Sequence, residues 1–137
     1  MRMKKIFVLF AVLGCLSCSE KRDNYVVSRS IPDIYPDYAD VVIPPNNAPL
    51  NYHINNKGTA FHVEFRTDKE DGFVLEQSSP DIIIPENQWR RLIRSNRGKN
   101  LYIDIRVKND AWTKFSTIKD SIVSEEVEPY LAYRLIN

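Results

Sequence analysis

Phe61-His62-Val63-Glu64-Phe65-Arg66 is the stretch of this chain that decides its fold most clearly. Apolar and polar side chains alternate along it, so that one face is apolar and the other is polar. A β-strand with one buried face has this period of two, whereas an amphipathic helix repeats its apolar positions every three or four residues. We therefore predict a half-buried strand here.

The same alternation returns in other parts of the sequence. Leu101–Val107 is the second long example, and Asn109-Asp110 then predicts a tight turn into a hairpin partner at 111–117. Further short runs of strand character occur at 50–54, 73–77, 81–85, 121–125 and 130–136. Together these stretches predict seven or eight short strands.

One segment, 85–98, breaks the pattern. Trp89, Leu92 and Ile93 fall at helical spacing, a proline stands at the start and a glycine at the end. We predict one short helix over about 86–97, which crosses between strands and covers an open end of the core with Trp89.

Many short strands, separated by turns and interrupted by one helix, predict an all-β fold. We expect an antiparallel β-sandwich of immunoglobulin-like architecture over residues 37–137. The cysteine–tryptophan–cysteine pattern of antibody domains is absent, so the likeness concerns architecture only. Without residues 1–17, which we predict to be removed, 137 − 17 = 120 residues remain, and this length suits a single folded domain.

The beginning of the chain has the layout of a secretory signal. Residues 1–5 are basic, residues 6–16 are apolar, and the sequence turns polar from Ser17 onward. We predict a signal peptide over residues 1–17. Its apolar run of eleven residues is shorter than the roughly 20 that cross a bilayer.

A small residue directly before Cys18 looks like a bacterial lipoprotein cleavage site. We favour Cys18 as the lipidated residue because the polar sequence begins there; Cys15, which follows Gly14, is the alternative. Two or more acyl chains, such as palmitate, hold a protein stably to a membrane. We expect an outer-membrane lipoprotein of the cell envelope, on the periplasmic or the surface face, with a flexible linker over residues 18–36.

The composition excludes several classes of function. Removing residues 1–17 takes away three basic residues and lowers the formal net charge from +1 to −2, which argues against a nucleic-acid partner. The rest of the chain has no Gly-x-Ser-x-Gly elbow, no phosphate-binding glycine loop and no cysteine pair. We therefore expect a protein that is not an enzyme and that has no cofactor and no resident metal.

Three stretches, 35–51, 89–99 and 128–136, are similar to a known family. Their most specific phrases are Ile-Pro-Pro-Asn-Asn-Ala-Pro-Leu-Asn and Pro-Tyr-Leu-Ala-Tyr-Arg-Leu-Ile. The chain resembles the N-terminal region of TolB-like β-propeller lipoproteins of Gram-negative anaerobes. The resemblance implies a lipoprotein signal, a small β-rich domain and then a propeller, but this sequence stops at Asn137, where the propeller would begin. We expect a stand-alone or truncated front end, with a propeller domain or an envelope protein as its partner.

The leading functional hypothesis is a non-enzymatic scaffold or interaction module, and the alternative is a lipoprotein that binds glycans or other surface ligands. For the alternative, Trp112 near the predicted hairpin tip is a candidate platform for a sugar ring, joined by Tyr35 and Tyr38.

Three further groups of residues are weaker candidates for ligand sites, and for each the alternative is an ordinary solvated surface. A hairpin through 55–58 would bring His53, His62 and Glu64 onto one face, which is an admissible zinc set. The loop 68–72 has a faint likeness to a calcium loop. A basic helix face for anionic lipid or polysaccharide is formed by Arg90, Arg91, Arg94, Arg97 and Lys99. In each case exposed polar residues are the favoured interpretation.

Overall fold

A computed structural model describes residues 25–128 of the chain. The predicted signal peptide, Cys18 and the strand predicted at 130–136 lie outside the described residues. Within residues 25–128 there is no helix with the length and apolar character needed to cross a membrane. In chain order the elements are β1 (Tyr25–Val27), β2 (Ile34–Tyr35), β3 (Val42–Ile43), β4 (Tyr52–Ile54), β5 (Ala60–Thr67), β6 (Gly72–Gln77), β7 (Asp81–Ile82), α1 (Glu86–Ser95), β8 (Asn100–Lys108), β9 (Trp112–Lys114) and β10 (Ile118–Ile122).

The antiparallel ladder between β5 and β8 forms the centre of the molecule. It runs from Ala60 opposite Lys108 to Thr67 opposite Leu101. Every second side chain of both strands points into the core. These inward apolar residues, each at most 4% exposed, are Phe61, Val63, Phe65, Leu101, Ile103, Ile105 and Val107. Because burying one such side chain contributes about 1.5–3 kcal/mol, this ladder supplies much of the stability of the fold.

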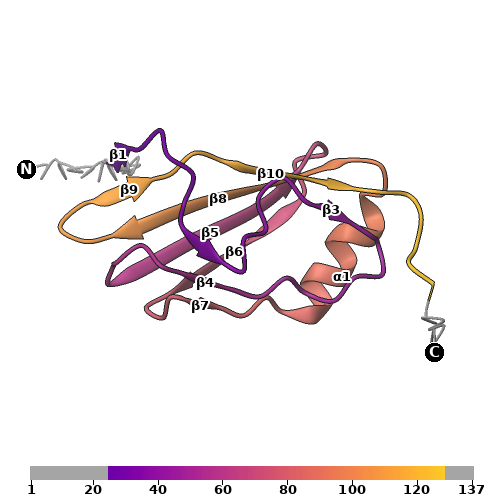
Figure 1. Ribbon diagram of the computed structural model, residues 1–137, viewed down its shortest axis with the longest axis horizontal. Helices are drawn as coiled ribbons and strands as arrows, with labels where there is room; N and C mark the ends of the chain where they lie inside the picture. Colours follow the sequence, from indigo (N-terminus) through magenta and orange to yellow (C-terminus); the bar gives the residue numbers. More distant parts are fainter. Residues whose placement is uncertain (1–24, 129–137) are drawn as a thin grey trace, which may run out of the picture.

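The large sheet grows outward from this ladder (Figure 1). β6 pairs with the other edge of β5, while the other edge of β8 is divided between β10, beside its first half, and β9, beside its last residues. β3 and β1 then add to β10 and β9 in parallel. The sheet is therefore mixed, whereas we expected only antiparallel pairing. The difference arises because residues 25–43 precede the hairpins in the chain and run back along their free edges.

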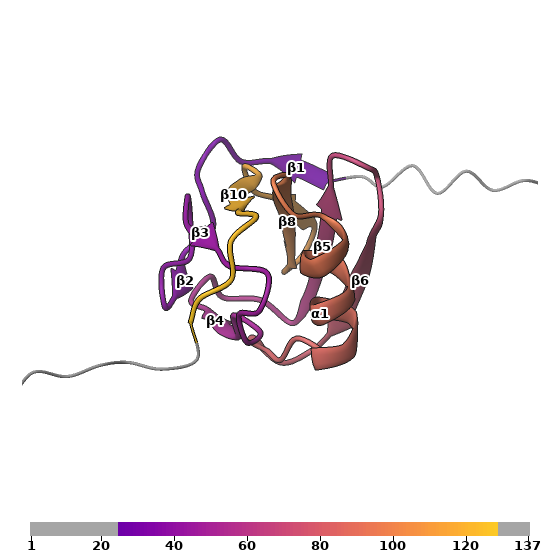
Figure 2. The ribbon, with the colours of Figure 1, turned by 90° about the vertical axis from the view of Figure 1, so that its right-hand side faces the viewer.

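A small antiparallel sheet, in the order β2-β4-β7, and α1 cover the inner face of the large sheet. Figure 2 looks along the long axis and shows this layering. Ile54 of β4, Ile82 of β7 and Trp89 of α1 belong to the same buried cluster as the inward residues of β5 and β8. The predicted all-β fold with one short helix is confirmed.

The predicted helix is confirmed as α1, which ends two residues before the predicted limit. Trp89 is 1% exposed, and its ring lies edge-on to Phe65 with 6.5 Å between the ring centroids. The Trp89 Nε1–H donates to the Asn47 carbonyl oxygen at 3.1 Å. The helix stops at buried Asn96, whose side-chain amide donates to a carbonyl oxygen of the last turn at 2.8 Å.

Residues 25–36 belong to the folded domain, so the prediction that they form part of a flexible linker is wrong. β1 and β2 pair with strands of the large and the small sheet, and Ile34 lies in the core. Asn55 also fastens the segment, since its Nδ2–H donates to Asp33 Oδ1 at 2.9 Å. Strands of two or three residues at a sheet edge have no sequence period of their own, because their pairing depends on partners far along the chain.

β4 and β5 do not form the predicted hairpin. β4 pairs with β2 and β7, and residues 55–58 carry the chain from the small sheet to the large one. A Cβ atom on Gly58 would lie 2.2 Å from Val107 Cγ1 and 3.1 Å from the Lys108 carbonyl oxygen, so glycine permits the close approach at this crossing. The apolar residues of β4 therefore reach the core from the layer opposite β5. The strand predicted at 121–125 is β10, which begins three residues earlier, at Ile118.

Asp120 places a carboxylate inside the core. It lies on the inward face of β10 and is 1% exposed. Its Oδ1 accepts a hydrogen bond from the Val41 main-chain N–H at 3.0 Å, but within residues 25–128 its Oδ2 and the buried Tyr52 hydroxyl have no hydrogen-bond partner. Burial raises the pKa of Asp120 to about 6, while burial and the nearby Asp120 charge raise the pKa of Tyr52. An ionised Asp120 therefore opposes folding.

We predict that Asp120→Asn stabilises the fold at neutral pH. The carboxyl has a pKa of 3.8 in the unfolded chain and about 6 in the folded protein, so the folded state binds more protons between these values. The stabilising contribution of the protonated group is complete below pH 3.8 and is lost as the pH rises through about 6. With some screening by solvent, we expect Asn to raise the free energy of unfolding by about 1–2 kcal/mol at neutral pH.

Urea unfolding at pH 7 and near pH 4 measures this effect. The gain should largely disappear near pH 4, and the exposed control Glu125→Gln should show no comparable gain. An Asp120→Asn protein that is no more stable than the wild type at pH 7 would contradict the prediction.

Candidate functional site

Aromatic and basic side chains gather on the outer face of the large sheet, at the end where β1 and β9 lie side by side (Figure 1). In the β8–β9 hairpin Lys108 is opposite Trp112 and Arg106 is opposite Lys114. These residues share the outer face because side chains alternate along a strand. β1 adds Tyr25, in register with Trp112. We call these five residues the cation–aromatic cluster.

Each ring of the cluster has a cation over it. The Lys108 ammonium nitrogen lies 5.8 Å from the centroid of the Trp112 ring. The Arg106 guanidinium carbon and the Lys114 nitrogen lie 5.3 Å and 6.0 Å from the centroid of the Tyr25 ring. Such contacts contribute about 0.5–1 kcal/mol each at exposed sites. The cluster offers ring surface to apolar groups or sugars and positive charge to anions.

Asp104 lies beneath this face and supports it. Its side chain is 4% exposed and accepts hydrogen bonds from Arg66 Nε, at 2.8 Å, and from the Thr117 hydroxyl, while Lys114 Nζ is 3.9 Å from its Oδ1. Burial alone would raise the pKa of Asp104, but the hydrogen bonds from Thr117 and Arg66 and the charges of Arg66 and Lys114 lower it overall. The ionised carboxylate therefore anchors Lys114 beside Tyr25.

Tyr35 and Tyr38 do not join Trp112 in one platform. Tyr35 lies in β2 of the small sheet, opposite His53, and is 72% exposed. Tyr38 is partly buried against the core. Tyr25 is the aromatic neighbour of Trp112 instead. The Tyr25-Val-Val run carried a weak sequence signal for a strand, but the short run gave no means of finding its partner.

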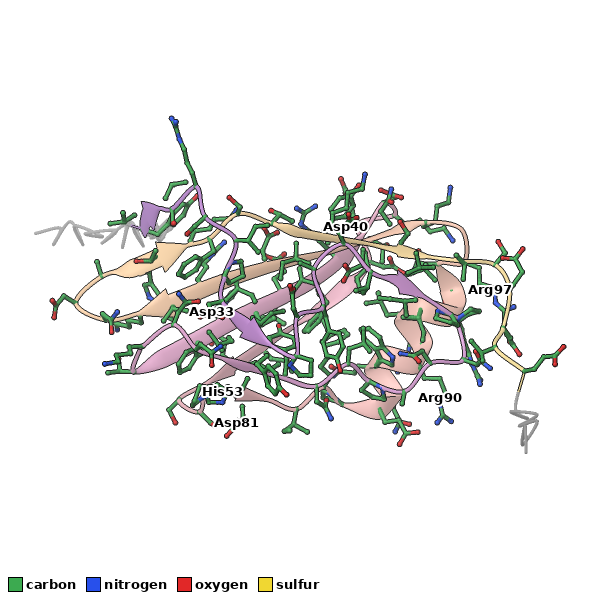
Figure 3. The ribbon with its side chains drawn as sticks, in the orientation of Figure 1. Asp33, Asp40, His53, Asp81, Arg90 and Arg97 are labelled. Atoms are coloured by element: carbon green, nitrogen blue, oxygen red, sulfur yellow. The ribbon has the colours of Figure 1, made fainter. Side chains whose placement is uncertain are left out.

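The two histidines lie in different sheets, so the arrangement considered for zinc is wrong. His53 Nδ1 is 2.7 Å from Asp81 Oδ1 on the small sheet, and Figure 3 shows these two side chains together. His62 Nδ1 is 2.9 Å from Glu76 Oε1 on the large sheet. Within residues 25–128 no group of three or more His, Cys, Asp or Glu side chains is placed to hold a metal ion.

The carboxylates of the 68–72 loop fasten neighbouring elements. Asp68 accepts hydrogen bonds from the Asn100 main-chain N–H and from the Tyr102 hydroxyl, both at 2.9 Å, and these bonds lower the pKa of Asp68. Asp71 Oδ2 accepts a hydrogen bond from the buried Asn96 amide at 2.9 Å. Both carboxylates thus have protein donors, and their geometry gives no argument for the calcium alternative.

The basic face of α1 is partly neutralised. Arg90 pairs with Glu86 one turn earlier, and Arg97 pairs with Glu126. Figure 3 shows Arg90 and Arg97 at the end of the molecule away from β1. A hollow of about 250 Å³ lies there between the loop 45–49 and α1. With these acidic partners, the helix face is a weaker candidate for an anionic ligand than the cation–aromatic cluster.

We predict that Asp104→Asn destabilises the domain by about 1–2 kcal/mol at neutral pH, because Arg66 and Lys114 lose their buried anionic partner. The pKa of Asp104 is lowered by folding, so its contribution is present above the unfolded value of 3.8 and is lost as the pH falls through the folded value. Urea unfolding should show the difference from wild type shrinking in acid. Asp110→Asn, on the exposed β8–β9 turn, is the control. Unchanged stability of Asp104→Asn at pH 7 would show that the carboxylate does not support this face.

The comparisons with known proteins found no match: no family model, no curated protein and no solved structure matches the chain. The resemblance to TolB-like lipoproteins therefore stays a prediction from the sequence. The candidate site rests on the geometry of the cation–aromatic cluster and of the Asp104 network beneath it.

Proposed function

We propose that the chain is a lipoprotein of the cell envelope, anchored in the outer membrane through acylated Cys18. Its domain acts as a non-enzymatic scaffold or interaction module beside a propeller domain or another envelope protein. The signal-like residues 1–17 and the small residue before Cys18 support the anchor. An immunoglobulin-like classification is also a proposal; the two β layers around one core support it, while the mixed sheet and α1 are departures.

The observation that carries this proposal is the position of the two ends of the described chain. β1 begins at one end of the long axis, and the chain leaves near α1 at the other end (Figure 1). Two hydrogen bonds fix the exit: Asn46 Nδ2–H donates to the Val127 carbonyl oxygen at 2.8 Å, and the Val127 N–H donates to Asn46 Oδ1 at 3.0 Å. A partner that contacts the domain near Val127 would therefore lie at the opposite end of the domain from β1.

The alternative, a glycan- or ligand-binding lipoprotein, keeps support from Trp112. Its platform would consist of Trp112 and Tyr25, because Tyr35 and Tyr38 are not adjacent to Trp112. Both rings lie at the end of the domain where the described chain begins, seven residues after Cys18. A lipid on Cys18 would therefore place them near a membrane as well as near any surface glycan.

We predict that Cys18→Ala abolishes lipid attachment. The full-length protein is produced in a Gram-negative host with labelled palmitate, and the envelope is separated from the soluble fraction. The wild type should carry label and leave the membrane only in detergent, whereas Cys18→Ala should carry none. Cys15→Ala is the matched control and should keep the label.

The two variants also separate the alternatives. Loss of label in Cys15→Ala alone would assign the lipid to Cys15. Membrane association and labelling that survive unchanged in Cys18→Ala would contradict the proposed anchor at this residue.

A further inference from the structure

The β1–β9 end of the domain exposes a continuous apolar strand. Tyr25 and Val27 lie on the face of half-buried Trp112 and are 38% and 66% exposed, while Val26, on the opposite face of this edge strand, is 61% exposed. Single exposed apolar residues are ordinary, but a contiguous group beside aromatic rings marks a surface that contacts something.

The length of chain before β1 limits where this end can lie. Seven residues of chain lead from Cys18 to Tyr25. Fully extended, they span at most about 25 Å. A lipid on Cys18 therefore keeps the β1–β9 end close to the membrane surface, and α1 lies at the opposite end of the domain (Figure 1).

The chemistry of this end matches a membrane interface. Tyr and Trp rings favour the headgroup level of a bilayer, where one part of the ring is apolar and another is wet. Lys and Arg side chains lay their apolar stems on such a surface and place their charges among anionic headgroups. Lys108 and Lys114 already lie over the Trp112 and Tyr25 rings, so apolar and cationic groups share one face. Asp104 holds Lys114 from below without reaching the surface itself.

We propose that the β1–β9 end docks on the membrane, with Tyr25, Val27 and Trp112 at the headgroup level and Lys108 and Lys114 on anionic lipid headgroups. This docking rests on the proposed lipid anchor, which brings the surface to the bilayer. The docked domain would keep one orientation relative to the membrane, whereas a domain held by the lipid alone could rotate freely about its linker.

The test uses the full-length lipidated protein in vesicles of phosphatidylcholine, with or without phosphatidylglycerol, whose acyl chains carry bromine near the headgroup. Bromine quenches tryptophan fluorescence at short range. Trp112 should be quenched, more strongly with phosphatidylglycerol, and Trp112→Phe should remove the effect because the remaining Trp89 is buried.

Lys108→Glu should weaken the quenching in vesicles that contain phosphatidylglycerol. Lys99→Glu is the charge-matched control. Lys99 directly precedes β8, whereas Lys108 is the last residue of β8, so the two side chains lie about 30 Å apart along the strand. Equal melting temperatures of the two variants show that both fold.

The outcomes separate the anchor from the docking. Protein that floats with the vesicles but shows no quenching of Trp112 is anchored and not docked, which overturns this proposal alone. Protein that does not float overturns the anchor and, with it, the docking. Fluorescence that responds to soluble envelope polysaccharide and not to brominated lipid assigns Trp112 to a glycan and also overturns the docking.

Discussion

The antiparallel ladder between β5 and β8 is the interaction on which the other elements depend, because these two strands provide the edges to which they attach. β6 occupies the outer edge of β5, and β9 and β10 divide the outer edge of β8. The inward residues of the ladder form the floor on which the small sheet and α1 pack. A slip of one residue in this register would turn the apolar face outward and bury the polar one, so the register fixes both faces of the sheet.

The same ladder gives the domain two unlike ends. Where β5 ends and β8 begins, Thr67 and Asn96 join the strands to the end of α1 through a buried hydrogen bond of 3.2 Å. Where β8 ends, the hairpin to β9 and the edge strand β1 carry the cation–aromatic cluster. One end is closed by a helix and a polar network, and the other leaves apolar and basic side chains at the surface. This polarity supports the proposal of a module with one end at the membrane and the other directed away from it.

The sequence predicted the elements whose own side chains carry a period. The alternation at 61–66 and 101–107 and the helical spacing of Trp89, Leu92 and Ile93 correctly located β5, β8 and α1. β1 and β2 were missed because strands of two or three residues owe their existence to partners at least 18 residues away. The pairing of β4 was wrong because a turn-like sequence at 55–58 does not reveal that the chain is crossing between sheets.

The burial of polar residues also depends on partners that the sequence does not reveal. Nothing in the sequence marks Asp104 or Asp120 as buried, since a carboxylate in an alternating pattern is normally exposed. Asp104 is buried by its neighbours on the outer face, and Asp120 faces inward on a strand whose register the sequence did not fix. For the candidate site, the sequence predicted a hairpin that carries Trp112, and Trp112 lies in the β8–β9 hairpin, but its neighbour Tyr25 depends on the pairing of β1 with β9.

In the proposed arrangement, the domain is held with its β1–β9 end at the membrane and its α1 end away from it. Both cysteines of the chain lie in residues 1–18, so a cysteine placed in the domain is a unique label site once Cys18 is acylated. The most direct measurement is the rate at which a bulky polyethylene-glycol maleimide modifies Asp110→Cys and Val127→Cys in the vesicle-anchored protein, relative to the rates in detergent. If the β1–β9 end docks on the membrane, Asp110→Cys should be labelled slowly on vesicles and Val127→Cys at an unchanged rate. Equal rates at both positions, or protection at Val127→Cys instead, would contradict it.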